Sequence, residues 1–146
     1  MANSLEFPAF SGDRNSQTLY GSFVSGGASI TSQDCAGFYV SQTGTGAYTI
    51  TFGATGAVQK YPTSPANYVS AGSTTSPLLC IGFVQEDAAN GQSLQLVVLS
   101  SSSITSSGTM TIVFNSAANT PANPTSGTTI RLNIEMKNSS TPRKGS

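Results

Sequence analysis

The segment from Ile130 to Met136 constrains the fold most, because every second residue in it is apolar. The four apolar side chains, which alternate with polar ones, are Ile130, Leu132, Ile134 and Met136. Successive side chains of a β-strand point to opposite faces, so this period of two is typical of a strand with one buried face. The segments from Tyr48 to Phe52 and from Met110 to Phe114 repeat the pattern. No segment carries the 3.6-residue apolar stripe of a long helix.

Turn-forming residues separate these segments at short intervals. Residues 41–46 predict a hairpin and Asn90-Gly91 predicts a tight turn. Residues 61–77 and 115–127 contain several prolines, so they predict connections outside any sheet. Short strands with this punctuation are typical of a sandwich or barrel. We therefore predict an all-β fold: a single jelly-roll or β-sandwich domain of about seven or eight antiparallel strands.

The expected domain organisation follows from where the alternation begins and ends. Residues 1–18 show little periodicity and are predicted to form an extended N-terminal arm. Residues 19–137 are predicted to form the β-sandwich domain, and residues 138–146 a polar C-terminal tail. Within the domain, Val97 and Leu99 add apolar residues to the second face of their strand. We therefore expect that strand to be central and covered on both sides.

The composition argues against catalysis. Charged residues make up 8% of the chain, serine and threonine account for 42 of the 146 residues, and histidine is absent. Without histidine the chain lacks the commonest general base and the commonest metal ligand. The six acidic residues do not cluster as in calcium-binding loops, and the six basic residues form no run suited to nucleic acid. We therefore expect no enzymatic activity, no cofactor, no metal and no nucleic-acid partner.

Cys35 and Cys80 are too few for a disulfide scaffold. Each lies in an apolar stretch, so we expect both to be buried free thiols, with a single bridge between them as the alternative. The first residues lack the basic and apolar regions of a signal peptide, and no stretch approaches the length of a membrane span. We therefore expect synthesis in a cytoplasm and no membrane partner.

Two segments resemble strands of phage proteins. Gly44–Phe52 reads Gly-Thr-Gly-Ala-Tyr-Thr-Ile-Thr-Phe. It resembles a strand of capsid decoration (cement) proteins and of fibre-tip domains with a tumour-necrosis-factor-like jelly-roll fold. Gly127–Ser140 is similar to the last strand of these proteins, and Leu19–Phe23 is similar to their first core strand after a short arm. The similarity covers roughly a third of the chain, by motif and spacing.

This resemblance implies a structural virion protein that is made in a host cytoplasm and located on the capsid surface. Such a protein decorates and stabilises a phage shell by non-covalent binding, here as a homo-oligomer that we expect to be a homotrimer. The implied partners are other copies of the chain and the major capsid protein. Leu5, Phe7 and Phe10 are the candidate contacts, because large apolar side chains anchor interfaces. A clasp of the arm on its own domain is the other interpretation of these residues.

A receptor-binding or glycan-binding tip domain of a head or tail fibre is the alternative function. Tyr61 and Tyr68, in the proline-containing segment, would then be outer-loop contacts that stack on the sugar rings of a glycan receptor. Packing within the loop is the other interpretation of both tyrosines. A secreted adhesin module is a third possibility, which the absence of a signal-peptide pattern disfavours.

Overall fold

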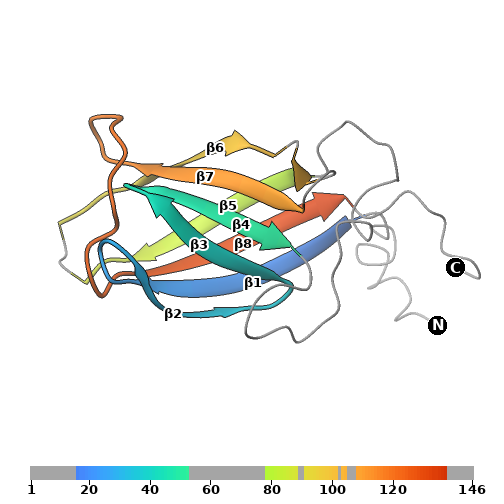
Figure 1. Ribbon diagram of the computed structural model, residues 1–146, viewed down its shortest axis with the longest axis horizontal. Helices are drawn as coiled ribbons and strands as arrows, with labels where there is room; N and C mark the ends of the chain where they lie inside the picture. Colours follow the sequence, from blue (N-terminus) through green and yellow to red (C-terminus); the bar gives the residue numbers. More distant parts are fainter. Residues whose placement is uncertain (1–15, 53–77, 89–90, 102, 105–107, 138–146) are drawn as a thin grey trace, which may run out of the picture.

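The computed structural model describes residues 16–52, 78–88, 91–101, 103–104 and 108–137 (Figure 1). These residues form eight β-strands. The strands are β1 (Ser16–Ser25), β2 (Ile30–Cys35), β3 (Phe38–Gly44), β4 (Ala47–Phe52), β5 (Leu78–Glu86), β6 (Gln95–Ser100), β7 (Thr109–Asn115) and β8 (Thr129–Lys137).

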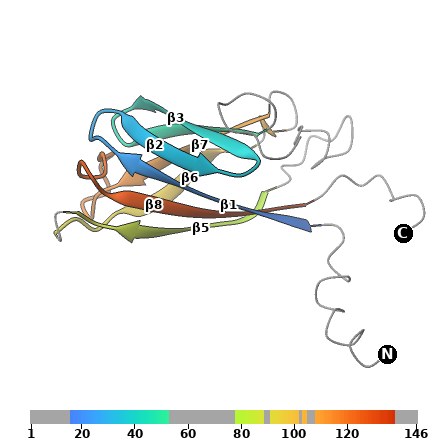
Figure 2. The same cartoon turned by 90° about the horizontal axis from the view of Figure 1, so that it is seen from below.

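The strands form two four-stranded sheets that face each other. Sheet A has the order β2-β1-β8-β5 and sheet B the order β3-β4-β7-β6, and every pairing is antiparallel. β2 and β3 lie at one side of this sandwich, and β5 and β6 lie at the opposite side (Figures 1 and 2). The prediction of an all-β sandwich of about seven or eight antiparallel strands is confirmed.

β8 explains why one alternating segment constrains the fold so strongly. It lies between β1 and β5, and its pairing with β1 runs from Ser16 opposite Lys137 to Val24 opposite Thr129. All four of its alternating apolar side chains are buried, whereas Arg131 and Asn133 on the other face are exposed. The apolar face of β8 thus lies against sheet B, and the polar face is the outer surface of sheet A.

Aromatic rings from both sheets meet in the core. Phe23 on β1 lies 5.2 Å from Tyr48 on β4, measured between ring centroids, and Tyr48 lies 5.5 Å from Phe114 on β7. Phe83 on β5 completes the cluster at 5.3 Å from Phe114. Burying a side chain of this size stabilises a fold by about 1.5–3 kcal/mol. The ring contacts therefore hold sheet A against sheet B.

The predicted hairpin at residues 41–46 is confirmed. β3 and β4 pair from Phe38 opposite Phe52 to Gly44 opposite Ala47, and the chain turns at Thr45 and Gly46. Residues 116–128, most of the second proline-containing connection, belong to no strand. The other connection, residues 61–77, lies outside the described residues.

Two predictions about the strands need correction. β1 begins at Ser16, so residues 16–18 belong to sheet A and not to the predicted arm; residues 1–15 and 138–146 lie outside the described residues. The prediction that the strand holding Val97 and Leu99 is central and covered on both faces is wrong. β6 is an edge strand, and these side chains are 38% and 61% exposed. The apolar second face of β6 therefore points to solvent.

Candidate functional site

Among the eight strands, only those of one sheet contain charged residues. β3, β4, β6 and β7, which form sheet B, contain none. The charged residues in the strands of sheet A are Asp34, Glu86, Arg131, Glu135 and Lys137. Arg131 on β8 and Glu86 on β5 form an exposed ion pair. The strands of sheet B therefore offer only hydroxyl, amide and apolar side chains to solvent.

The large aliphatic side chains that are exposed in the described part of the chain all lie on β5 and β6. Leu79 and Val84 on β5 are 55% and 60% exposed, and Val97 and Leu99 on β6 are 38% and 61% exposed. Both are edge strands, at the same side of the sandwich (Figure 1). Val84 lies opposite Arg131, on the outer face of sheet A, and Val97 lies opposite Val113, on the outer face of sheet B. We call these four residues, taken together, the β5–β6 apolar side.

Leu79 and Leu99 lie at irregularities of strand pairing. The register shifts between Leu78 and Cys80 in β5, and between Val98 and Ser100 in β6. A bulge leaves one residue out of the hydrogen-bonded ladder and bends the strand, so each leucine leaves the regular pairing. Bulges also obstruct the addition of a further strand to an edge. A partner at this side would therefore make contact through side chains rather than by extending a sheet.

The two cysteines have opposite environments. Cys35 is buried, and its thiol donates to the Ser22 carbonyl oxygen at 3.6 Å. Burial, supplemented by the negative charge of Asp34, raises the pKa of Cys35 to about 12. Both thiols are free, as predicted, but the prediction that both are buried is wrong for Cys80, which is exposed. Pairing of Cys80 with Glu135 places it on the outer surface of sheet A.

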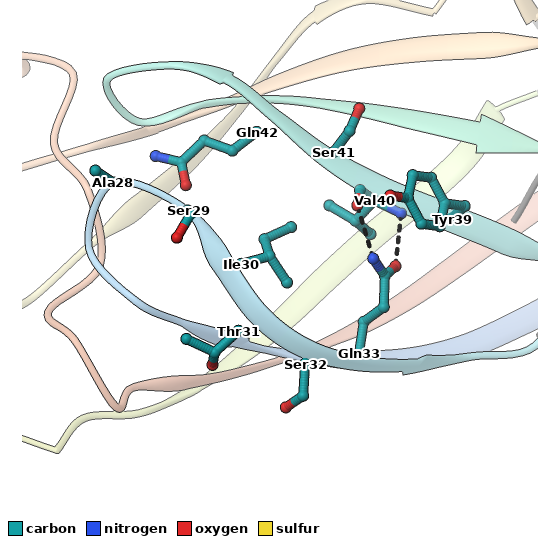
Figure 3. A pocket seen from close by; sticks show the side chains of 10 residues that line it. All are labelled: Ala28, Ser29, Ile30, Thr31, Ser32, Gln33, Tyr39, Val40, Ser41 and Gln42. Atoms are coloured by element: carbon teal, nitrogen blue, oxygen red, sulfur yellow. Dashed lines mark hydrogen bonds between the residues drawn. The ribbon is translucent and has the colours of Figure 1, made fainter. Parts of the chain in front are cut away.

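A hollow opens between β2 and β3, at the side of the sandwich opposite the β5–β6 apolar side (Figure 3). Its volume is about 300 Å³. Ten residues line it: Ala28, Ser29, Ile30, Thr31, Ser32, Gln33, Tyr39, Val40, Ser41 and Gln42. None of these ten is charged. The Ile30 side chain of β2 points into the gap between the two strands, and the partly exposed ring of Tyr39 on β3 lies at one end (Figure 3). We call this the β2–β3 hollow.

The Gln33 side chain joins the two strands that border the hollow. Its amide accepts a hydrogen bond from the Val40 nitrogen at 2.9 Å and donates one to the Val40 oxygen at 3.0 Å. β2 and β3 belong to different sheets and share no strand pairing in the described residues. The Gln33 amide therefore makes the two bonds that a neighbouring strand would otherwise make to Val40.

The Gln42 side chain is also held, but only through its nitrogen. Nε2 donates to Asn123 Oδ1 at 2.9 Å and to the Gly27 oxygen at 3.2 Å. Oε1 is buried and has no hydrogen-bond partner among the described residues. An unsatisfied buried acceptor costs about 1–3 kcal/mol, which offsets part of what the bonds made by the nitrogen contribute.

The residues predicted as contacts lie outside the described residues: Leu5, Phe7, Phe10, Tyr61 and Tyr68. Sequence analysis missed both the β5–β6 apolar side and the β2–β3 hollow. The sequence does contain one signal of the β5–β6 apolar side, because Val97 and Leu99 place apolar residues on the second face of their strand. The hollow had no comparable signal, because it depends on two strands of different sheets lying side by side.

The described residues provide neither a metal site nor a membrane-spanning helix. Within them, no three His, Cys, Asp or Glu side chains come together as a metal ion would require. They also include no helix with the length and apolarity to cross a membrane. Comparison of the chain with known protein families, with curated proteins and with solved structures finds no match.

Proposed function

We propose that this chain is a structural virion protein that decorates and stabilises a phage capsid shell. In this proposal it binds non-covalently, without catalysis, as a homo-oligomer whose expected state is a trimer. The resemblance of Gly44–Phe52 and Gly127–Ser140 to strands of capsid decoration proteins supports the assignment to a shell. The β5–β6 apolar side supports the assignment to an oligomer.

The β5–β6 apolar side is the observation that carries the proposal. Exposed edge strands are usually protected by charges, prolines or a covering segment. β6 contains neither charge nor proline, and its Leu99 side chain is 61% exposed. Removing apolar surface from water is worth about 25 cal/mol per Å². This side therefore favours contact with another protein surface.

A second copy of the chain is the partner that the chemistry fits best. The formal net charge of the chain is zero, and β6 belongs to the sheet whose strands carry no charge. Identical copies can therefore meet at β6 without charge repulsion, whereas a strongly acidic or basic partner would find no opposite charge on these strands. A stable interface of standard size buries roughly 1,200–2,000 Å² in total and needs no chemistry.

The copy number of this chain in purified particles from its source tests the assignment to a capsid. We expect quantitative mass spectrometry to find a number comparable to that of the main shell subunit. A handful of copies would instead indicate a fibre or tail tip. Absence from the particles would contradict any virion function.

The mass of the purified protein in solution tests the oligomer. We expect multi-angle light scattering to show a homo-oligomer, and Leu99→Lys to shift it toward the monomer, since burying an unpaired charge in an interface is costly. Thr43→Lys is the matched control, because Thr43 is exposed on β3 at the opposite side of the sandwich. An unchanged mass for Leu99→Lys would exclude β6 as the contact.

A deletion tests the predicted arm separately. β1 begins at Ser16, so removing residues 2–15 leaves the strand complete. We expect the shortened protein to remain folded and to lose binding to particles, because Leu5, Phe7 and Phe10 would be missing. If it still coats particles, the contact function of the arm is wrong, while the oligomer through β6 is unaffected.

A further inference from the structure

We infer that the outer face of sheet A binds a neutral oligosaccharide, with the ring of Tyr20 as the stacking surface. This function goes beyond the proposed capsid decoration, because it needs neither a particle nor a second copy of the chain. It also uses neither of the residues that sequence analysis assigned to a glycan contact, which were Tyr61 and Tyr68.

Two adjoining hollows lie on this face, where β1, β8 and β5 run side by side (Figure 2). Each has a volume of about 380 Å³, and Tyr20 and Arg131 line both. The first hollow extends to Gly82 on β5, and the second extends to Asp34 on β2. We call the two hollows together the Tyr20 site. Its two connected parts suit a ligand of more than one ring.

The pairing register places the key residues of the first hollow on one face of the sheet. Tyr20 lies directly opposite Asn133, and Asn133 lies directly opposite Gly82. Residues paired in this way have neighbouring side chains on the same face. Gly82 has no side chain, and no described residue beyond its chain neighbours lies within 4 Å of the position that a Cβ would take. The Tyr20 ring, 64% exposed, and the exposed Asn133 amide therefore border a space that β5 leaves open.

The polar groups of the Tyr20 site are available to a ligand. The side chains of Tyr20, Ser22 and Asn133 make no hydrogen bond within the part of the chain that the structure describes. Arg131 is exposed and binds Glu86 through Nη1, which leaves the donors of its other nitrogens. A sugar hydroxyl both donates and accepts, so it can bond to each of these groups. The apolar C–H face of a sugar ring suits the exposed ring of Tyr20.

The charges around the site favour a neutral ligand. Arg131 lines both hollows, so a cationic ligand would meet a like charge in either. Asp34 lines the second hollow and Glu86 is bound to Arg131, so an anionic ligand would meet like charges as well. A purely apolar ligand would cover the Asn133 amide without bonding to it, which costs free energy. A neutral ligand with many hydroxyl groups and apolar C–H faces avoids these costs.

Titration of the full chain with oligosaccharides, followed by amide NMR, tests this inference. The neutral probes are maltotriose, cellotriose and the trimer of N-acetylglucosamine, with trigalacturonic acid as the anionic comparison. We expect at least one neutral probe to shift residues 20–22, 82–84 and 131–133, and the acid to shift them less. No shifts in these segments with any neutral probe, shifts only elsewhere, or larger shifts with the acid would overturn the inference.

Two variants with matched controls sharpen the test. Tyr20→Ala should weaken binding about tenfold, since the ring contact is lost. Tyr39→Ala is its control, because Tyr39 is 36% exposed on β3 and lines neither hollow. Gly82→Ile should fill the open space without a clash and block the first hollow, whereas Thr43→Ile adds the same side chain at an exposed position of β3.

The outcomes of these variants separate the inference from the proposed function. Equal loss of binding in Tyr20→Ala and Tyr39→Ala, or unchanged binding in Gly82→Ile, would overturn the saccharide site. The copy number of the chain in particles is measured independently. A failure of the saccharide site therefore leaves the capsid assignment untouched, and absence from particles leaves the saccharide site untouched.

Discussion

Gly46 and Phe114 approach so closely that no side chain fits between them. The Gly46 oxygen accepts a hydrogen bond from the Phe114 nitrogen at 2.8 Å. A Cβ atom on Gly46 would lie 2.5 Å from the Phe114 oxygen and 2.7 Å from the Ala122 nitrogen. Gly46 also has a φ of 64°, in the left-handed region that glycine adopts readily. The turn between β3 and β4 therefore depends on glycine for two independent reasons.

We expect Gly46→Ala to lower the free energy of unfolding by more than about 2 kcal/mol, because the clash is with backbone atoms. Gly27→Ala is the control for the backbone conformation alone: its φ is 87° and nothing lies within 4 Å of its Cβ position. It should cost about 1–2 kcal/mol. Urea denaturation of both variants measures the difference. Equal losses would show that the contact with Phe114 contributes nothing.

Replacing Gln33 by methionine tests the amide bridge between the sheets. Gln33→Met keeps the length of the side chain and removes both bonds to Val40, so the unfolding free energy should fall by about 1–3 kcal/mol. Ser32→Met, at the exposed neighbouring position, controls for the added apolar surface. Denaturant unfolding gives both values. Similar stability of the two variants would contradict a bridging function for Gln33.

The two thiols should differ in reactivity. We expect Cys80 to react with Ellman's reagent in the folded protein, because it is exposed, and Cys35 to react only after unfolding, because it is buried with a pKa of about 12. Cys80→Ser should remove the fast phase and leave the slow one. A fast phase that survives Cys80→Ser would mean that Cys35 is accessible. Slower reaction of Cys80 in the oligomer than in the monomer would place β5 at the contact.

Stability should fall as the solution becomes alkaline. Burial raises the pKa of Cys35 from 9.0 to about 12. Burial also raises the pKa of Tyr48 from 10.0 to about 12, with the Ser25 hydroxyl offsetting part of the increase. Both groups ionise more easily in the unfolded chain, so the stability they contribute is complete below about pH 9 and declines as the pH rises toward 12.

Unfolding measured in denaturant from about pH 8 to about pH 11 checks this dependence. Cys35→Ala should decline less steeply than the natural protein, because one of the two ionising groups is absent. Its absolute stability is also expected to change with the lost side chain, so the slopes are compared and not the values. Identical slopes would show that the Cys35 thiol titrates alike in the folded and unfolded chain.

The strands that sequence analysis predicted best are those with one buried and one solvated face. β8 and β4 alternate strictly, because each buries only the side chains that point toward the other sheet. β2 shows no such alternation. It is an edge strand on which Ile30 and Gln33 are half-buried and Cys35 is buried, so its sequence offers little periodicity to detect.

The candidate sites were harder to predict, because they depend on contacts between distant strands. An apolar residue such as Leu99 has the same sequence pattern whether its own chain or a partner covers it. Only the order of the strands shows that β6 is at an edge. The β2–β3 hollow depends on the chain crossing from one sheet to the other near Gly37, whose φ is 86°. The pattern of apolar and polar residues within a strand does not show which sheet the next strand joins.

Dissolved salt should act unequally on the two sheets. Salt screens the interactions of exposed charges, most completely beyond the Debye length of about 8 Å at physiological ionic strength, and the charged strand residues belong to sheet A. Contacts made by the strands of sheet B have no charge to screen, and sulfate strengthens the burial of apolar surface. Assembly through β6 should therefore persist from low to high ionic strength, and precipitating salts such as sulfate should strengthen the association.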